Sequence, residues 1–282
     1  MHIPIKYRGF FIPRAIENDL LSFDMIRAYH HRLSRDVLEE CKHNWLQWTN
    51  RFESVDRFNK WAITHGIHDA ILNQIAYRSK TVKKFFSFKD DYKFYLEFLY
   101  PYNSETITWD QIDKIQDNSY ILVSVPNTRG CIPENWNDLL KQCERTNSKI
   151  FFDGAYYGTS FETIDVNHDA IDCVAFSLSK NFCLNNTRSG VIFGNDIAWT
   201  LTIAMQREYY DYFSVDIANK ILPKYEPLYV TKHAKKIQKD MYGDKACEIW
   251  FMVEDKDHMG IKTPRLINNE IKDKVQEAIN VG

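Results

Sequence analysis

The sequence predicts an α/β fold built around a mostly parallel sheet, because three apolar runs are each followed by polar residues. Helical patterns separate these runs, which are 120–125, 149–152 and 173–176. Continuous apolar runs are typical of parallel strands, since crossover helices cover both faces of their sheet. Ligands of such sheets bind beyond the carboxyl ends of the strands. We therefore expect the polar residues after the three runs to share one site: Asn127, Asp153 and Lys180.

The N-terminal part of the chain predicts a long helix and then a strand, a turn and a second helix. After an extended segment that contains Pro13, apolar spacing predicts helix from about Ala15 to Asn50. Residues 61–71 then predict a short apolar strand, a glycine turn and a new helix. Gly66 lets the backbone approach a ligand closely, and amides at the start of the new helix predict a phosphate site.

Two histidines, His65 and His68, flank this glycine turn and allow two interpretations. A metal site needs a third ligand, and the sequence offers none at a suitable spacing. Turn and capping roles are therefore preferred, and we predict no metal. Ile67, between the histidines, is expected to contact a ligand through its backbone.

The rest of the chain continues the alternation of strands and helices. Between the turn and the central runs it predicts a strand at 83–88, an aromatic-rich helix start at 90–95, a strand at 96–100, and a turn and short helix at 104–116 with Ser104 as a cap. Later it predicts a crossing helix at 135–145, a strand at 190–194, helices at 203–213, 215–221 and 231–241, a strand at 247–253, and a closing helix from about Asn269.

Lys180 lies in a polar segment, 177–190, that directly follows a buried run. Desolvation and a neighbouring cation, Arg188, can lower the pKa of such a lysine, which makes its amine a nucleophile. Arg188 also suits a phosphate, because its planar fork matches the oxygens. The alternative is an ordinary loop lysine and a surface arginine. The polar ends of the other two runs favour the functional interpretation.

These motifs, taken in order, resemble those of fold-type I pyridoxal-phosphate enzymes. Within these enzymes the resemblance is to class I/II aminotransferases, and histidinol-phosphate aminotransferase-like members are the most similar. The motifs that carry the resemblance are Asn127-Thr128-Arg129-Gly130, Asp153-Gly154-Ala155-Tyr156 and Ser177-Leu178-Ser179-Lys180 with Arg188. The resemblance implies that Lys180 is the Schiff-base lysine and Asp153 the partner of the pyridine nitrogen. Tyr156 and Asn127 would donate to the phenolic oxygen of the cofactor.

The resemblance implies further contacts as well. Tyr92 would stack on the cofactor ring, with Tyr95 and Tyr102 as alternatives and core packing as the other explanation for all three. Arg265 would bind the α-carboxylate of the substrate. The remaining cofactor contacts would come from Gly66, Ile67, His68, Ser177, Ser179 and Arg188.

The same resemblance implies the architecture and the reaction. A large α/β domain over 53–200 would bind pyridoxal phosphate, and a small α+β domain would combine an N-terminal arm, 1–52, with a shortened C-terminal segment, 201–282. The expected function is an aminotransferase that moves an amino group between an amino acid or related amine and a keto acceptor. A decarboxylase or lyase of the same fold and a non-catalytic scaffold are the alternatives. By the same resemblance, a homodimer is expected.

Composition limits the partners and the compartment. The 282 residues are 44% hydrophobic and 26% charged with a net charge of −2, as in ordinary soluble globular proteins, so neither nucleic acid nor a membrane is expected as a partner. The six cysteines form no C-x-x-C pair, which favours reduced thiols in the cytoplasm. No signal-peptide or membrane-spanning pattern is evident, so we expect a cytoplasmic protein.

Overall fold

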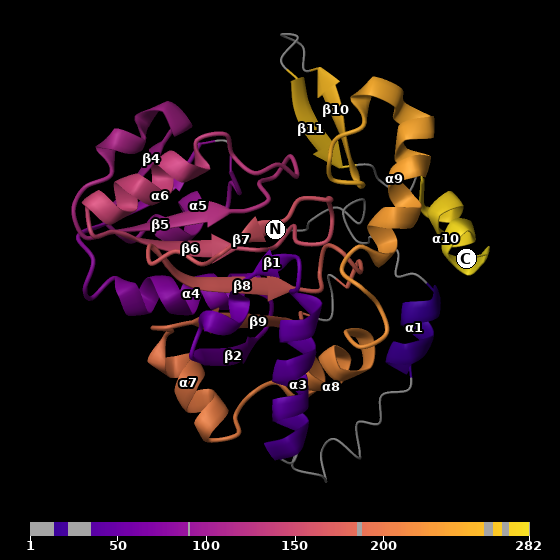
Figure 1. The fold of residues 1–282 in the computed structure, drawn as a ribbon, viewed down its shortest axis with the longest axis horizontal. Coiled ribbons are helices and arrows are strands. Elements are labelled where there is room, and N and C mark those ends of the chain that lie inside the picture. Colours follow the sequence, from indigo (N-terminus) through magenta and orange to yellow (C-terminus); the bar gives the residue numbers. More distant parts are fainter. Residues whose placement is uncertain are drawn as a thin grey trace.

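The centre of the molecule is a seven-stranded sheet (Figure 1). The structure, a computed structural model, describes residues 14–21, 35–89, 91–184, 188–256, 262–266 and 271–281. Across the sheet the order is β2-β9-β8-β6-β5-β3-β4. The strands are β2 (Lys60–Thr64), β3 (Lys84–Phe88), β4 (Ser104–Ile107), β5 (Ser119–Ser124), β6 (Lys149–Asp153), β8 (Ile171–Ser177) and β9 (Gly190–Gly194).

The prediction of a mostly parallel sheet is confirmed. β4, β3, β5, β6 and β8 pair in parallel, while β9 runs antiparallel to both of its neighbours, β8 and β2. In the register, Ser124 lies opposite Asp153, and Asp153 lies opposite Ala175. The carboxyl ends of the parallel strands therefore meet at one edge of the sheet.

Helices cover both faces of this sheet, as the continuous apolar strands require. Ile150 and Phe152 of β6 pack into one apolar layer, while Phe151 between them packs into the other. The first layer contains residues of α3 (Arg35–Trp48), α6 (Trp136–Arg145), α8 (Tyr212–Ile221) and α9 (Tyr229–Tyr242). The second contains residues of α4 (Ile67–Arg78), α5 (Tyr95–Leu99) and α7 (Trp199–Gln206).

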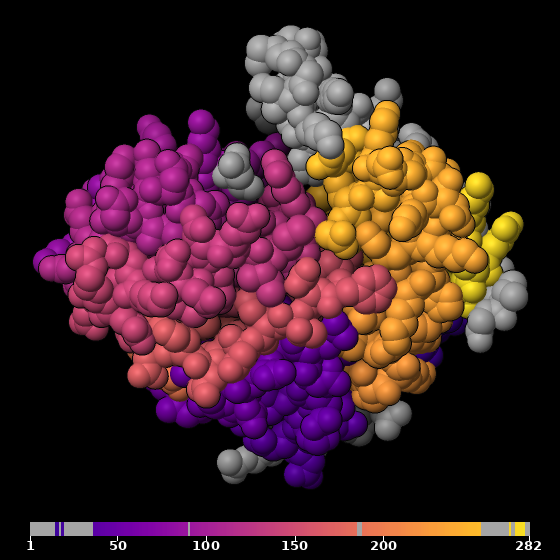
Figure 2. Space-filling view, turned by 45° about the horizontal axis from the view of Figure 1, so that its top comes forward, coloured from indigo at the N-terminus to yellow at the C-terminus, as the bar shows by residue number. Residues whose placement is uncertain are grey.

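The first and the last described helices lie close together beside the sheet. The N-terminal helix α1 (Arg14–Leu21) contacts α8 and α10 (Lys272–Val281), and α10 packs on α9. An antiparallel pair, β10 (Met252–Lys256) and β11 (Lys262–Leu266), completes this group (Figure 1). In the space-filling view, the orange and yellow C-terminal segment lies against one side of the magenta central segment (Figure 2).

The remaining elements are short. They are the parallel pair β1 (Phe52–Glu53) and β7 (Ile164–Asp165) and the 3-10 helices η2 (Val55–Arg57), η3 (Trp109–Lys114) and η4 (Gly243–Lys245). Nowhere in the described part of the chain is there a helix with the length and apolarity needed to cross a membrane.

Several predicted elements were wrong. Residues 96–100, predicted as a strand, belong mostly to helix α5, because Tyr95 and Leu99 are four residues apart and bury the same helix face. Ser104 caps no helix and instead begins the edge strand β4, which pairs with β3. The predicted strand at 247–253 starts only at Met252.

Helix boundaries also differ from the prediction. The single helix predicted over 203–213 is two helices, because Asp211 caps the second: its Oδ1 accepts a hydrogen bond of 3.0 Å from the Phe213 amide. The long N-terminal helix corresponds to α1 and α3, and residues 22–34 between them lie outside the described residues.

Candidate active site

A cavity of about 200 Å³ opens at the carboxyl edge of the sheet. Ten residues line it, and nine of them were predicted as site residues from the sequence. The lining is Ile67, His68, Tyr92, Asp153, Ala155, Tyr156, Ser177, Ser179, Lys180 and Arg188. These residues come from α4, the loop after β3, the end of β6 with the segment after it, and the end of β8 with the segment that leads to β9. The topology therefore brings together motifs that are more than 100 residues apart in the sequence.

Lys180 lies just after β8, half-buried in the cavity wall. Burial lowers its pKa, Asp153 acts in the opposite direction, and Arg188 lowers the pKa further. Its Nζ lies 5.8 Å from the ring centroid of Tyr156. A lysine with a lowered pKa in a cavity has more of the neutral amine that attacks a carbonyl carbon.

Asp153 is the last residue of β6 and is only 1% exposed. Its Oδ2 accepts a hydrogen bond of 2.7 Å from the Tyr95 hydroxyl, and its Oδ1 accepts one of 2.8 Å from the Ala155 amide. Burial raises the pKa of Asp153 to about 6, although both hydrogen bonds and the charge of Lys180 act against this. The carboxyl group is thus fixed at the cavity wall, where it can pair with a cationic ligand atom.

Other residues of the cavity lining suit an anion. Gly66 precedes α4 with a φ of 78°, and a Cβ on it would lie 3.4 Å from the Arg188 guanidinium. A Cβ on Gly190 would lie 2.8 Å from the Gly66 Cα, so the two glycines let the segments approach closely. Amides at the start of a helix, a guanidinium and hydroxyl groups are groups that bind anions, and the first turn of α4, Arg188, Ser177 and Ser179 all line this cavity.

His68 and Tyr92 pair across the cavity wall. The His68 Nε2 and the Tyr92 hydroxyl are 2.6 Å apart. Burial lowers the pKa of His68, and the charges of Arg188 and Lys180 lower it further. A lowered pKa favours a neutral ring, whose Nε2 accepts a hydrogen bond from the Tyr92 hydroxyl. His65 instead lies 3.2 Å from Asp211, so the two histidines bind different partners.

The structure separates the three tyrosines that were candidates for ring stacking. Tyr92 lines the cavity. Tyr95 is buried beneath it and binds Asp153, and Tyr102 packs against Phe85 with ring centroids 5.6 Å apart. Of these three, Tyr92 is therefore the one placed to contact a ligand in the cavity.

Two predicted site residues do not line this cavity. Asn127 lines a neighbouring cavity of about 380 Å³, and its Oδ1 accepts hydrogen bonds from the amides of Arg129 and Cys131. Arg265 lies in β11 opposite Val253, and its side chain is outside the described part of the structure. The roles of Asn127 and Arg265 remain predictions.

The sequence did not predict the side chains that position the Asp153 carboxyl group. Tyr95 is predicted from the sequence to stack on the cofactor ring or to pack in the core, and the hydrogen bond that it donates to Asp153 was not predicted. Asp91 and Ser124 were not identified at all, because they meet only when the loop after β3 packs on the end of β5. Nothing in the local sequence signals that pairing.

Known proteins provide an independent comparison. The sequence model of the family described as "Aminotransferase class I and II" matches residues 100–258, more than half of the chain. None of the curated proteins matched the sequence.

Solved structures share the fold at low sequence identity. An aminotransferase from Staphylococcus aureus is 15% identical with a TM-score of 0.65, and the match covers 88% of this chain and 76% of that one. A PLP-bound putative aminotransferase from Clostridium difficile 630 is 13% identical with a TM-score of 0.65 and coverages of 96% and 88%. Tyrosine aminotransferase from Leishmania infantum is 11% identical with a TM-score of 0.66 and coverages of 99% and 92%.

Proposed function

The chain belongs to the class I and II aminotransferase family, and we propose that it moves an amino group between an amino acid or related amine and a keto acceptor through Lys180. The enzyme is an aminotransferase whose cofactor is pyridoxal phosphate. The observation that carries the role of Lys180 is that its amine, the Asp153 carboxyl and the Arg188 guanidinium line one cavity.

The cavity fits this cofactor in charge and shape. Bound pyridoxal phosphate supplies an electron sink for the bonds broken at the substrate Cα. Asp153 would hold a proton on the ring nitrogen, and Arg188 with the first turn of α4 would hold the phosphate. The ring of Tyr92 would cover one face of the cofactor ring.

Lys180 has two roles in the proposal. It would hold the aldehyde carbon of the cofactor before the substrate arrives, which its lowered pKa favours. Once released, the same amine would move a proton between the substrate Cα and the cofactor C4′ as a general base and acid. Tyr156, which also lines the cavity, and Asn127 would donate to the phenolic oxygen, and Arg265 would bind the substrate carboxylate.

The test is a transfer assay with the purified chain, pyridoxal phosphate, a panel of amino acids and a panel of keto acids. We expect formation of a new amino acid and pyridoxamine phosphate. Lys180→Ala should abolish both, whereas Lys141→Ala, which removes an exposed lysine of α6, should change neither. A folded wild-type chain that binds no pyridoxal phosphate would contradict the proposal. Release of carbon dioxide without a keto product would instead indicate a decarboxylase.

We also propose the assembly and compartment that the family resemblance implies. A homodimer is supported by large apolar side chains left exposed on the packed helices α4 and α7: Leu72, Trp199 and Ile203. Sedimentation of the wild type and of Trp199→Glu would test it, since the variant should shift toward monomer. Free cysteines throughout the described residues support the cytoplasm.

The domain division is likewise a proposal. Residues 53–200 would form the large domain, and 1–52 with 201–282 would form the small one. The neighbouring positions of α1, α9, α10 and the β10–β11 pair support it (Figure 1).

A further inference from the structure

One hydrogen bond between side chains joins two separate segments of the cavity lining. His68 lies in the first turn of α4, just after the Gly66 turn, and Tyr92 lies in the loop after β3. The His68 Nε2 and the Tyr92 hydroxyl are 2.6 Å apart. This contact connects the helix start that is proposed to bind the cofactor phosphate with the ring that is proposed to cover the cofactor.

Other contacts of Tyr92 hold its backbone and one side of its ring. The Asp91 carboxylate accepts a hydrogen bond of 2.7 Å from the Tyr92 amide, and the ring of Tyr95 packs edge-on with centroids 5.5 Å apart. Among the described residues, His68 is the hydrogen-bond partner of the Tyr92 hydroxyl. Because the hydroxyl is at the far end of the side chain, this hydrogen bond determines where the ring points.

His68 is itself held in place by its surroundings. Its ring packs edge-on against Phe98 with centroids 5.2 Å apart and contacts Phe94 at 6.3 Å. Its backbone belongs to the 12-residue helix α4, whose buried residues pack on one face of the sheet. A side chain on such a fixed element can fix the position of its partner.

The groups around the pair favour the tyrosine as the donor. If Tyr92 donates to a neutral His68, one group, the Nδ1–H of His68, has no partner among the described residues. If His68 donates instead, the Tyr92 hydroxyl hydrogen and the Nδ1 lone pair both lack one. Arg188 and Lys180 line the same cavity, and their charges oppose a protonated imidazole. Tyr92 is therefore the donor, and His68 carries its proton on Nδ1.

We propose that His68 is a positioning residue that fixes the ring of Tyr92 at the cavity wall, in the orientation that covers the cofactor ring. This inference rests on the proposed function for its consequence, since the cofactor is what Tyr92 would cover. The competing explanation is that the His68 side chain contacts the cofactor phosphate directly, without any role of Tyr92.

Nitrogen-15 NMR of the histidine side chains in the cofactor-free chain tests the hydrogen bond itself. A hydrogen bond at one ring nitrogen of a histidine selects its tautomer. We expect His68 to carry its proton on Nδ1 in the wild type and to shift toward the Nε2–H tautomer in Tyr92→Phe, which keeps the ring and loses the donor. Tyr102→Phe, which changes a tyrosine outside the cavity lining, is the matched control. The same tautomer in the wild type and Tyr92→Phe would overturn the proposal.

Ligand affinity separates an effect through Tyr92 from a contact with the phosphate. The ligands are pyridoxal phosphate and pyridoxal, which has the same ring without the phosphate. His68→Phe keeps an aromatic ring and loses the acceptor, so we expect its dissociation constants for both ligands to rise by about 3- to 10-fold. His68→Gln, which keeps an acceptor, should lose less affinity. A loss for pyridoxal phosphate alone would support the phosphate contact and overturn the proposal.

A double variant tests whether His68 and Tyr92 act together. Tyr92→Phe alone should lose as much affinity as His68→Phe. The variant with both changes should lose no more than about 2-fold beyond either single variant, because both changes remove the same hydrogen bond. Losses that multiply in the double variant would show that the two side chains act independently, which contradicts the proposal.

The two proposals fail in distinguishable ways. If the folded wild type binds neither ligand, the proposed function fails, and the NMR comparison still decides whether His68 holds Tyr92. If His68→Phe does not fold, as circular dichroism would reveal, the tautomer of His68 in Tyr92→Phe remains decisive. Unchanged affinity of Tyr92→Phe for both ligands would overturn the positioning role and leave the proposed function intact.

Discussion

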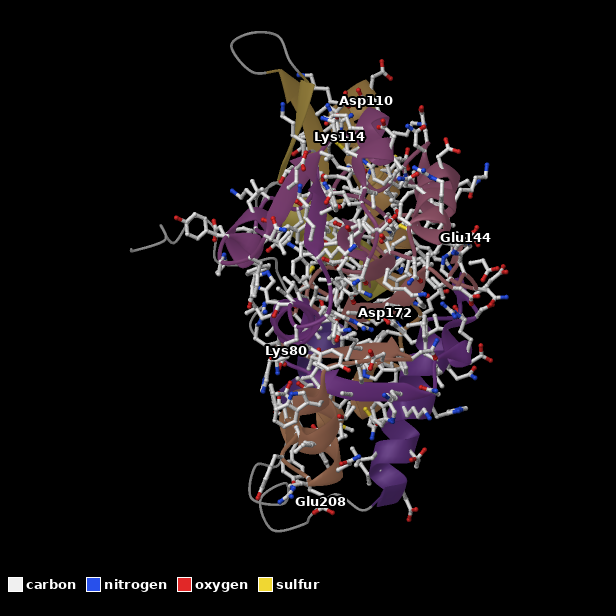
Figure 3. All side chains as sticks on the ribbon, turned by 90° about the vertical axis from the view of Figure 1, so that its left-hand side faces the viewer. Lys80, Asp110, Lys114, Glu144, Asp172 and Glu208 are labelled. Carbon is white, nitrogen blue, oxygen red and sulfur yellow. The ribbon has the colours of Figure 1, made fainter. Side chains whose placement is uncertain are left out.

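Asp153 and Asp172 are buried aspartates on neighbouring strands of the sheet, yet the chain surrounds them differently. Asp172, labelled in Figure 3, lies near the start of β8. It binds Arg78 through hydrogen bonds of 2.5 and 3.1 Å and accepts others from Tyr120 and Gln74. Asp153, at the opposite edge of the sheet, has neutral donors, the Tyr95 hydroxyl and the Ala155 amide, and lines a cavity.

The difference separates a structural carboxyl from one prepared for a ligand. A buried charge is tolerated when a protein cation and enough hydrogen bonds compensate its desolvation, as Arg78 does for Asp172. The neutral donors of Asp153 hold its carboxyl group in place without compensating its charge. The carboxylate can therefore still pair with a cationic atom of a ligand in the cavity. Burial alone therefore does not distinguish the two aspartates, whereas the charge of the partner does.

The largest effect should follow from Asp153→Asn. An amide cannot hold the proton on the cofactor ring nitrogen, so we expect the rate of amino transfer to fall by about 10³-fold or more. The free energy of unfolding at pH 8 should not decrease, because the change removes a buried charge. Single-turnover kinetics and urea unfolding measure the two quantities. If the variant loses stability but keeps the wild-type rate of amino transfer, Asp153 has a structural role and no role in the reaction.

Asp172→Asn should have the opposite profile. Arg78 would keep a buried charge without its bidentate carboxylate, so we expect the free energy of unfolding to fall by about 3–5 kcal/mol. Activity per folded molecule should stay near wild type, since Asp172 lies far from the cavity in the register of the sheet. Urea unfolding with a parallel transfer assay measures both. If this variant is as stable as wild type, Asp172 does not have the structural role that distinguishes it from Asp153.

A smaller effect concerns the pH dependence of stability. Asp91 and Asp153 have pKa values raised to about 7 and about 6 from the unfolded value of 3.8. A raised carboxyl pKa gives a contribution to stability that is complete below about pH 4 and is lost as the pH rises through the folded value. Asp91→Asn should therefore gain stability relative to wild type between pH 4 and 8, by up to about 4 kcal/mol. Urea unfolding of Asp91→Asn and wild type at four pH values tests this. A difference in the free energy of unfolding that does not change with pH would contradict it.

The smallest effect is expected at the cationic end of the cavity. Arg188→Gln should raise the dissociation constant for pyridoxal phosphate by about 10- to 100-fold while leaving stability nearly unchanged. Arg207→Gln, an exposed change after α7, is the matched control for loss of one positive charge. Fluorescence titration with the cofactor measures the affinities. Equal affinity of Arg188→Gln and Arg207→Gln for pyridoxal phosphate would show that Arg188 does not bind the phosphate.

The sheet was predicted from local apolar patterns, and most of the nine cavity residues from the order of motifs that the chain shares with a known family. Apolar runs that end in Asp153 and Lys180 already place those side chains at one edge once the strands are parallel. Segments 96–100 and 247–253 were mispredicted because short apolar runs do not distinguish helix, strand and turn. The contact of Asp91 with Ser124 could not be predicted, since it depends on how a loop packs against a strand end.

The central claim is that Lys180 holds the cofactor, and peptide mapping after borohydride reduction tests it most directly. Borohydride fixes pyridoxal phosphate covalently to whichever lysine holds it, and mass spectrometry of the digested chain locates that residue. We predict a single modified lysine, Lys180, and no modification in Lys180→Ala. An unmodified chain, or a label on another lysine, would contradict the account.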